Sequence, residues 1–260
     1  MGLFDKKYCS ICGSKIGLLG NRKLTDGNMC KDCAAKLSPW FSDRRSSTVD
    51  EIKSQLAYRE ENKAAVAAFH TTRSLGKYTR LLLDEDARKF IVTGAKDLAE
   101  ANPDVLDYSQ VTGCDLEISE SRNELKIRDA EGKSVSYNPP RYEYSYNFYA
   151  AIRVNHPYFD QIRYSISNGS VKVGEQPMSG PAAGWKVNKP GVSLRQNEYH
   201  QYVNLGNEIK ETVERMRQEA REEFVAQNAP KTAVNCPFCG ASTIPDDNGC
   251  CEYCGSALNG

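Results

Sequence analysis

Apolar and polar positions alternate most regularly in the middle of the chain. Between residues 142 and 154, one set of alternate positions is aromatic or aliphatic, and the intervening positions include Glu143, Ser145 and Asn147. This period of two predicts a strand with one face buried. The apolar set is Tyr142, Tyr144, Tyr146, Phe148, Ala150 and Ile152.

Shorter apolar runs, separated by turn residues, predict more strands on both sides of this one. They fall at residues 81–83, 89–92, 111–118, 124–128, 135–137 and 162–166, of which the last is expected to end the sheet. Several short strands joined by turns are typical of an antiparallel barrel or sandwich. We therefore expect an α+β multidomain chain with a β-rich middle.

The helical patterns lie before and after this β region. Thr48 and Glu51 have the spacing of a capping box and predict a helix to about residue 69, with a middle so polar that we expect a surface brace. A short helix is expected at 96–101. A longer helix at 197–227 carries a continuous apolar stripe and would close the β domain. The stripe is Tyr202, Leu205, Ile209, Val213, Met216, Ala220 and Phe224. Residues 168–195, rich in Gly and Pro, are expected to form a mobile insertion.

Two cysteine pairs near the start of the chain predict a metal site. Cys9, Cys12, Cys30 and Cys33 form C-x2-C…C-x2-C, and each two-residue gap lets both thiolates of a pair face one ion. Gly13 suits the turn of a metal knuckle, Asp26-Gly27 predicts a hairpin turn, and the second pair opens a helix. These features predict a treble-clef-like finger. Trp40 and Phe41 are expected to pack back against it, and an exposed aromatic pair that binds a partner is the alternative.

A second set of paired cysteines lies near the end of the chain. Cys236, Cys239, Cys251 and Cys254 form two C-x-x-C-G knuckles, the pattern of a small zinc ribbon. Cys250 stands beside Cys251 and is the alternative ligand, but the two-residue gap to Cys254 favours Cys251. Disulfides are the alternative chemistry for a chain with ten cysteines; the spacing favours two structural Zn²⁺ ions, although another thiophilic metal fits the same ligands.

The charge is unevenly distributed. The chain has no net charge, but residues 1–47 carry nine Lys and Arg against four Asp, and residues 229–260 carry one Lys against three acidic residues. The N-terminal finger could place its cations on phosphates, which makes nucleic-acid binding an alternative function. These cations are Lys15, Arg22, Lys23, Lys31, Lys36, Arg44 and Arg45. With no apolar run long enough to span a bilayer and no leader-like N-terminus, we expect a cytoplasmic protein.

The stretch C-S-I-C-G-S-K-I-G-L-L-G-N-R-K-L-T-D-G-N-M-C-K-D-C resembles the N-terminal zinc finger of a family of uncharacterised bacterial proteins. The resemblance covers residues 8–41, with the four cysteines as ligands and Gly13 and Gly27 as turn residues. It implies that a treble-clef-like finger is joined to a bacterial PH-like region, in which a helix plugs a barrel. It implies architecture and no activity.

The expected organisation is a four-cysteine zinc finger at 1–41, a linker and helix at 42–74, a PH-like β domain at 75–228 and a four-cysteine zinc ribbon at 229–260. No catalytic motif is present, and Cys114 fits a buried apolar role better than that of a nucleophile. We therefore expect a non-enzymatic zinc-binding adaptor that docks another protein. Nucleic-acid binding by the finger and lipid or ligand binding by the PH-like region, with peripheral membrane contact, are the alternatives.

Overall fold

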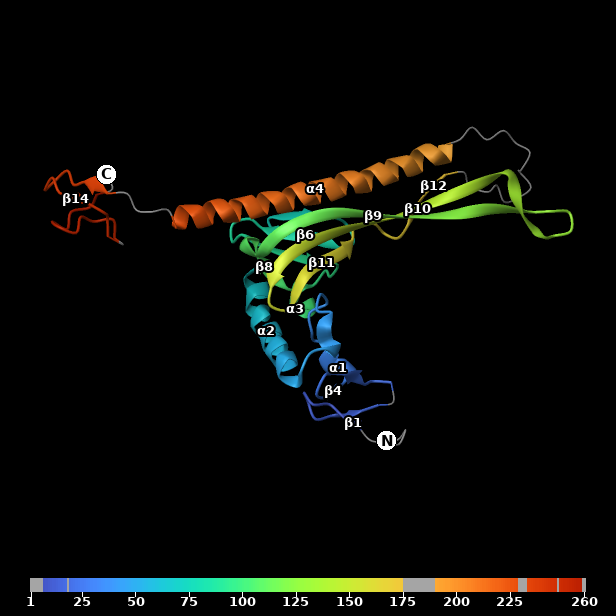
Figure 1. Ribbon diagram of the computed structural model, residues 1–260, viewed down its shortest axis with the longest axis horizontal. Coiled ribbons are helices and arrows are strands. Elements are labelled where there is room, and N and C mark those ends of the chain that lie inside the picture. Colours follow the sequence, from blue (N-terminus) through green and yellow to red (C-terminus); the bar gives the residue numbers. More distant parts are fainter. Residues whose placement is uncertain (1–6, 18, 175–189, 229–232, 247, 259–260) are drawn as a thin grey trace. The chain divides into compact units, whose positions relative to one another are not determined.

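The computed structural model describes residues 7–17, 19–174, 190–228, 233–246 and 248–258 (Figure 1). The chain divides into two compact units, Met1–Gln218 and Glu219–Gly260. Among the described residues, no helix is long and apolar enough to cross a membrane. The predicted mobile insertion lies partly outside the described residues, because 175–189 belong to the gaps.

The first unit begins with short elements around the N-terminal cysteines. Two small antiparallel hairpins precede a one-turn helix, and a 3-10 turn then leads into the long helix α2. Thr48 caps α2 through the predicted capping box with Glu51. These elements are β1 (Lys7–Tyr8), β2 (Lys15–Ile16), β3 (Arg22–Lys23), β4 (Asn28–Met29), α1 (Lys31–Ala34), η1 (Asp43–Arg45) and α2 (Val49–Ala68).

Two open, four-stranded antiparallel sheets follow. The first has the order β5-β6-β7-β8, and the second is built on β10, which pairs with β9 on one side and with β11 and β12 on the other. A closed PH-like barrel is not shown and remains a prediction. The elements are β5 (Arg73–Leu75), β6 (Arg80–Asp84), β7 (Lys89–Thr93), α3 (Leu98–Ala101), β8 (Val105–Asp107), η2 (Tyr108–Gln110), β9 (Val111–Arg128), β10 (Ser134–His156), β11 (Phe159–Ser165) and β12 (Val171–Gly174).

The second sheet corrects three sequence predictions. Residues 111–118 and 124–128 belong to one continuous strand, β9, and residues 135–137 and 142–154 belong to one strand, β10. The polar residues 119–123 of β9 pair with β10 and their side chains are exposed, so apolar alternation gives no signal there, and residues 138–140 of β10 lie at a register shift. Figure 1 shows this ribbon extending past the shorter strands. Strand β12 also follows β11, which is therefore not the last strand.

Helix α4 (Pro190–Gln227) begins before the predicted residue 197 and packs on both sheets through its part in the first unit. Arg73 of β5 forms an ion pair with Glu208, and the ring of Tyr199 packs edge-on against Phe148 of β10. A side chain at position 206, where the helix has Gly206, would place its Cβ 2.4 Å from Leu116 Cδ1 of β9. This close contact explains a glycine inside the predicted stripe, in which Ile209, Val213 and Met216 are buried.

Helix α2 is more deeply integrated than the predicted surface brace. Its buried side chains recur at helical spacing and include the polar Gln55, Arg59 and Asn62. Arg59 Nη1 donates to Asp104 Oδ1 at 2.8 Å, and the side chains of this ion pair are 8% and 0% exposed. Asp104 lies in the segment between α3 and β8. Helix α2 therefore buries polar side chains of its middle turns, Arg59 and Asn62, against this segment.

Asp104 connects three parts of the first unit. Besides Arg59, it accepts a hydrogen bond from Ser38 Oγ at 2.8 Å and from Tyr58 Oη at 3.2 Å. Arg59 Nε also donates to the carbonyl of Lys36 at 3.3 Å. We call Ser38, Tyr58, Arg59 and Asp104 the Asp104 network, because it joins the end of the N-terminal finger to α2 and to the first sheet.

The second unit contains the last turns of α4 and the C-terminal cysteines. Beyond the helix, β13 (Val234–Asn235) pairs with β14 (Ser242–Thr243), and an isolated bridge joins Cys250 to Ala257. Among its described residues, Cys236, Thr243 and Cys251 are the buried ones. So small a core gives little hydrophobic stabilisation.

Candidate metal centres

The structure gathers the two predicted sets of cysteines into two groups of four. In each group the Sγ atoms all lie within 4.8 Å of one another, and the described residues contain no other group of this kind. Each group is compatible with one structural metal ion, which makes two ions in all. The members are Cys9, Cys12, Cys30 and Cys33 in the first unit and Cys236, Cys239, Cys251 and Cys254 in the second.

The sulfur separations agree with a tetrahedral metal. Cys9 and Cys33 are separated by 3.9 Å and Cys12 and Cys30 by 3.8 Å. In the second group, Cys236 and Cys254 are 3.6 Å apart and Cys239 and Cys251 are 3.7 Å apart. A zinc–sulfur bond of about 2.3 Å places the corners of a tetrahedron about 3.8 Å apart. None of the ten cysteines, all of them among the described residues, forms a disulfide.

Three of the four pairs are held by the same backbone turn. In the first, the amide of Gly13 donates to the carbonyl of Cys9 at 2.8 Å, and the amide of Cys9 donates to the carbonyl of Ser14. Gly240 and Gly255 repeat the turn in the second unit. All three glycines have φ between 71° and 74°, where other residues are strained, which explains the recurring C-x-x-C-G sequence.

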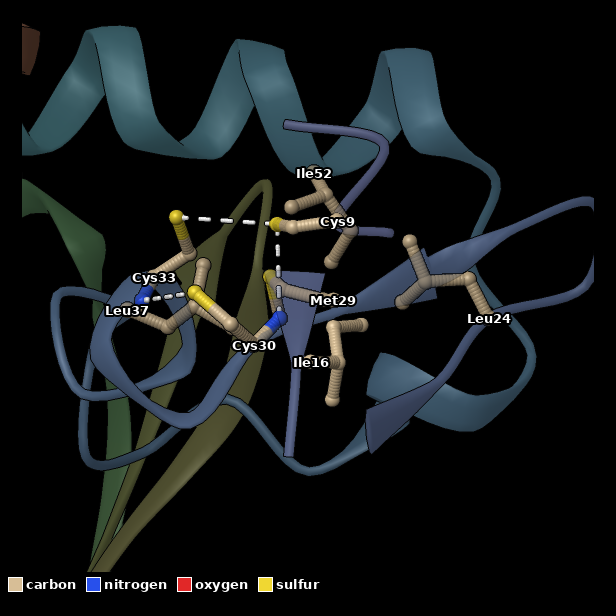
Figure 2. Close-up of a cluster of buried hydrophobic side chains, with 8 residues drawn as sticks. All are labelled: Cys9, Ile16, Leu24, Met29, Cys30, Cys33, Leu37 and Ile52. Atoms are coloured by element: carbon tan, nitrogen blue, oxygen red, sulfur yellow. Dashed lines mark hydrogen bonds between the residues drawn. The ribbon is translucent and has the colours of Figure 1, made fainter. Parts of the chain in front are cut away.

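The fourth pair is positioned by helix α1 instead. Cys30 is the N-cap residue, and its Sγ accepts a hydrogen bond from the amide of Cys33 at 3.4 Å. The amide of Cys30 in turn donates to Cys9 Sγ at 3.3 Å. Burial alone would raise the pKa of Cys9, but backbone hydrogen bonds from Cys12, Cys30 and Ile11 lower it overall, which favours the thiolate form that a metal requires. Figure 2 shows these contacts, with Met29 and Ile16 beside the cysteines.

Cys9, Cys30 and Cys33 also belong to a hydrophobic cluster. The other buried members are Ile16, Leu24, Met29, Leu37 and Ile52. Phe41 packs against the cluster, as predicted, while Trp40 is half-buried. Ile52 lies on α2 and is fully buried (Figure 2). Val49 and Leu56 pack against the same cluster. The core of the finger therefore extends beyond residue 41 into α2.

Cys250 lies outside the second group. Its Sγ lies 3.8 Å from the carbonyl of Asn248, whereas the neighbouring Cys251 is buried with its Sγ in the group. This agrees with the two-residue gap to Cys254, which favours Cys251 as the member of the group.

Two serines lower the pKa values of the cysteines that precede them by two residues, an effect that the cysteine spacing alone does not predict. The hydroxyl and the backbone of Ser14 lower the pKa of Cys12 to about 6, and Ser256 does the same for Cys254. At the equivalent position of the remaining knuckle, the backbone of Ala241 lowers the pKa of Cys239, but burial and the neighbouring thiols raise it to about 12. The sequence C-G-S, which the knuckles of Cys12 and Cys254 share, could have indicated this lowered pKa.

The difference between a serine and an alanine after the knuckle glycine predicts how readily each site releases its metal in acid. The folded pKa of Cys12 is depressed, so its thiolate contributes fully above the ordinary thiol pKa and is lost as the pH falls through about 6. Ser14→Ala raises this pKa, and we expect the first site to release its metal at a higher pH. Ala241→Ser should have the opposite effect on the second site. Native mass spectrometry from about pH 8 to about pH 5 measures both; unchanged release in both variants would contradict the serine effect.

Other candidate residues are not brought into the metal groups. Cys114 is buried in β9 and burial raises its pKa to about 12, which fits an apolar role. His156 stacks on Phe159, with ring centroids 4.1 Å apart, and burial lowers its pKa. His70 and His200 are exposed. Of the seven predicted phosphate-contacting cations, four line one pocket: Arg22, Lys23, Arg44 and Arg45.

Part of the first unit matches a known protein family. Residues 7–55 match DUF4428, a domain of unknown function. The match begins at β1 and ends inside α2, so the DUF4428 domain contains the first cysteine group and Ile52 of its core. No curated protein and no solved structure matches the chain.

Proposed function

We propose that the protein is a non-enzymatic, cytoplasmic adaptor that binds two Zn²⁺ ions and docks another protein through its C-terminal unit. Zinc suits both groups because four thiolates match its preferred tetrahedral shell, and the DUF4428 domain would then be a treble-clef-like finger. A zinc ion held by four thiolates keeps no open position for water or substrate, which supports a structural role. A PH-like character of the middle region remains part of this proposal.

The exposed aromatic residues of the C-terminal unit carry the proposal. Phe238 and Tyr253 occupy the same position in the two knuckles, directly before the second cysteine, and are 72% and 71% exposed. Ile244 is also exposed. Small units normally bury their aromatic residues, and solvent-exposed aromatic side chains are favoured anchors of protein interfaces. Acidic residues nearby, among them Asp246 and Glu252, disfavour a phosphate backbone as the partner.

An affinity pull-down from the native host, with and without nuclease, tests this function. We expect a defined protein partner that survives nuclease and is lost with Phe238→Ser/Tyr253→Ser. Leu19→Ser removes a 90% exposed apolar side chain from the DUF4428 domain and serves as the matched control. Because the aromatic residues are exposed, the double variant should keep both metals. Recovery that collapses with nuclease would instead support nucleic-acid binding, and a partner retained by the double variant would contradict the proposed surface.

A further inference from the structure

The DUF4428 domain contains a strongly basic pocket separate from the cysteines. It has a volume of about 760 Å³ and lies between the β3–β4 hairpin and η1. Its lining contains no carboxylate and no aromatic ring. The lining residues are Asn21, Arg22, Lys23, Leu24, Thr25, Arg44 and Arg45.

Local hydrogen bonds bring the two basic segments together. Arg44 Nη1 donates to the carbonyl of Lys23 at 2.9 Å, and the amide of Thr25 donates to the carbonyl of Ser47 at 2.9 Å. Arg22 Nη1 lies 3.3 Å from the carbonyl of Leu19, to which it donates. Two guanidinium groups are therefore anchored through part of their donors, and their remaining N–H groups are available to a ligand.

The positive charge of the pocket is not compensated by the protein. Within the described ranges, none of the four cations forms an ion pair with a carboxylate. The pKa of Arg44 is lowered by its burial and also by the charges of Arg22 and Arg45. Like charges held this close repel one another, and a bound anion would relieve that repulsion.

The chemistry of the lining identifies the class of anion. Guanidinium groups match phosphate oxygens in a bidentate manner, and four cations exceed what one phosphate requires. The absence of a ring disfavours a stacked base, which single-stranded nucleic acid uses. We propose that Arg22, Lys23, Arg44 and Arg45 bind a compact ligand with two or more phosphate groups, either free or as a lipid headgroup. This site is independent of the proposed docking surface in the C-terminal unit.

Titration calorimetry on the full, zinc-loaded chain tests this site with inorganic pyrophosphate and inositol hexakisphosphate. Lys23→Gln/Arg45→Gln removes two charges from side chains that make no hydrogen bond in the described part of the chain. We expect the affinity to fall about tenfold or more. Lys126→Gln/Arg128→Gln on the exposed end of β9 removes the same charge and should change the affinity less than about twofold.

Three further measurements separate the outcomes. Arg45→Lys keeps the charge and the fold but removes the guanidinium fork, and it should also weaken binding. Phosphatidylcholine vesicles with and without phosphatidylinositol bisphosphate distinguish a lipid headgroup from a free ligand. An RNA oligonucleotide that binds more tightly than the compact probes, and more so with length, would overturn the proposal. Equal losses in the two double variants, or no binding by the wild type, would overturn it as well.

Discussion

Cys9→Ser/Cys12→Ser is expected to abolish metal binding in the DUF4428 domain and to unfold it. Three of the eight buried residues in its core cluster are cysteines of the candidate metal group, so the apolar core that remains without them is small. A structural zinc ion contributes on the order of 10 kcal/mol to the folding of such a domain. We expect bound metal to fall from two ions to one, and amide protection to be lost between residues 7 and 47.

Elemental analysis together with hydrogen exchange measures this result. Cys250→Ser is the matched control, because it removes a cysteine that stands next to Cys251 but lies outside both groups. It should retain two metal ions and full protection. Cys236→Ser/Cys239→Ser should also lose one ion, but its loss of protection should be confined to the C-terminal unit. Two ions retained by Cys9→Ser/Cys12→Ser would rule out the first site.

Asp104→Ala is expected to destabilise the first unit by about 3–5 kcal/mol. The substitution leaves the guanidinium of Arg59 buried at 8% exposure without its carboxylate, and it removes the acceptor of Ser38 and Tyr58. Urea unfolding of the zinc-loaded chain measures the change as a lower midpoint at an unchanged m-value.

Replacing both partners at once separates the effect of the buried charge from simple loss of packing. Arg59→Met/Asp104→Leu replaces both partners with apolar groups, and we expect it to be more stable than Asp104→Ala. Lys53→Ala is the surface control: it removes the exposed pair with Asp50 on the same helix and should change stability by less than about 1 kcal/mol. If Asp104→Ala costs no more than this control, the Asp104 network contributes little to stability.

The cysteine groups could be predicted from sequence because their geometry is local. A two-residue gap followed by glycine specifies the knuckle that places two sulfurs, and the sequence around Cys9 contains all of it. Arg59 shows why other features could not be predicted. A polar helix face normally meets water, and its burial follows from Asp104, which lies far along the chain. Strand β9 crosses a polar stretch for a similar reason: its pairing with β10 sustains it, while its own side chains give no alternation.

The shared core of the DUF4428 domain and α2 determines which segment can be transferred as a module. A fragment cut after residue 41 would lack Ile52, which is a fully buried member of the core cluster that contains three of the cysteines. The family match ends at residue 55, just beyond this side chain. A gene fusion that carries the cysteines to another protein must therefore carry the first turns of α2 as well. Because those turns belong to the longer helix α2, the domain would be joined to the rest of a fusion protein through a helix.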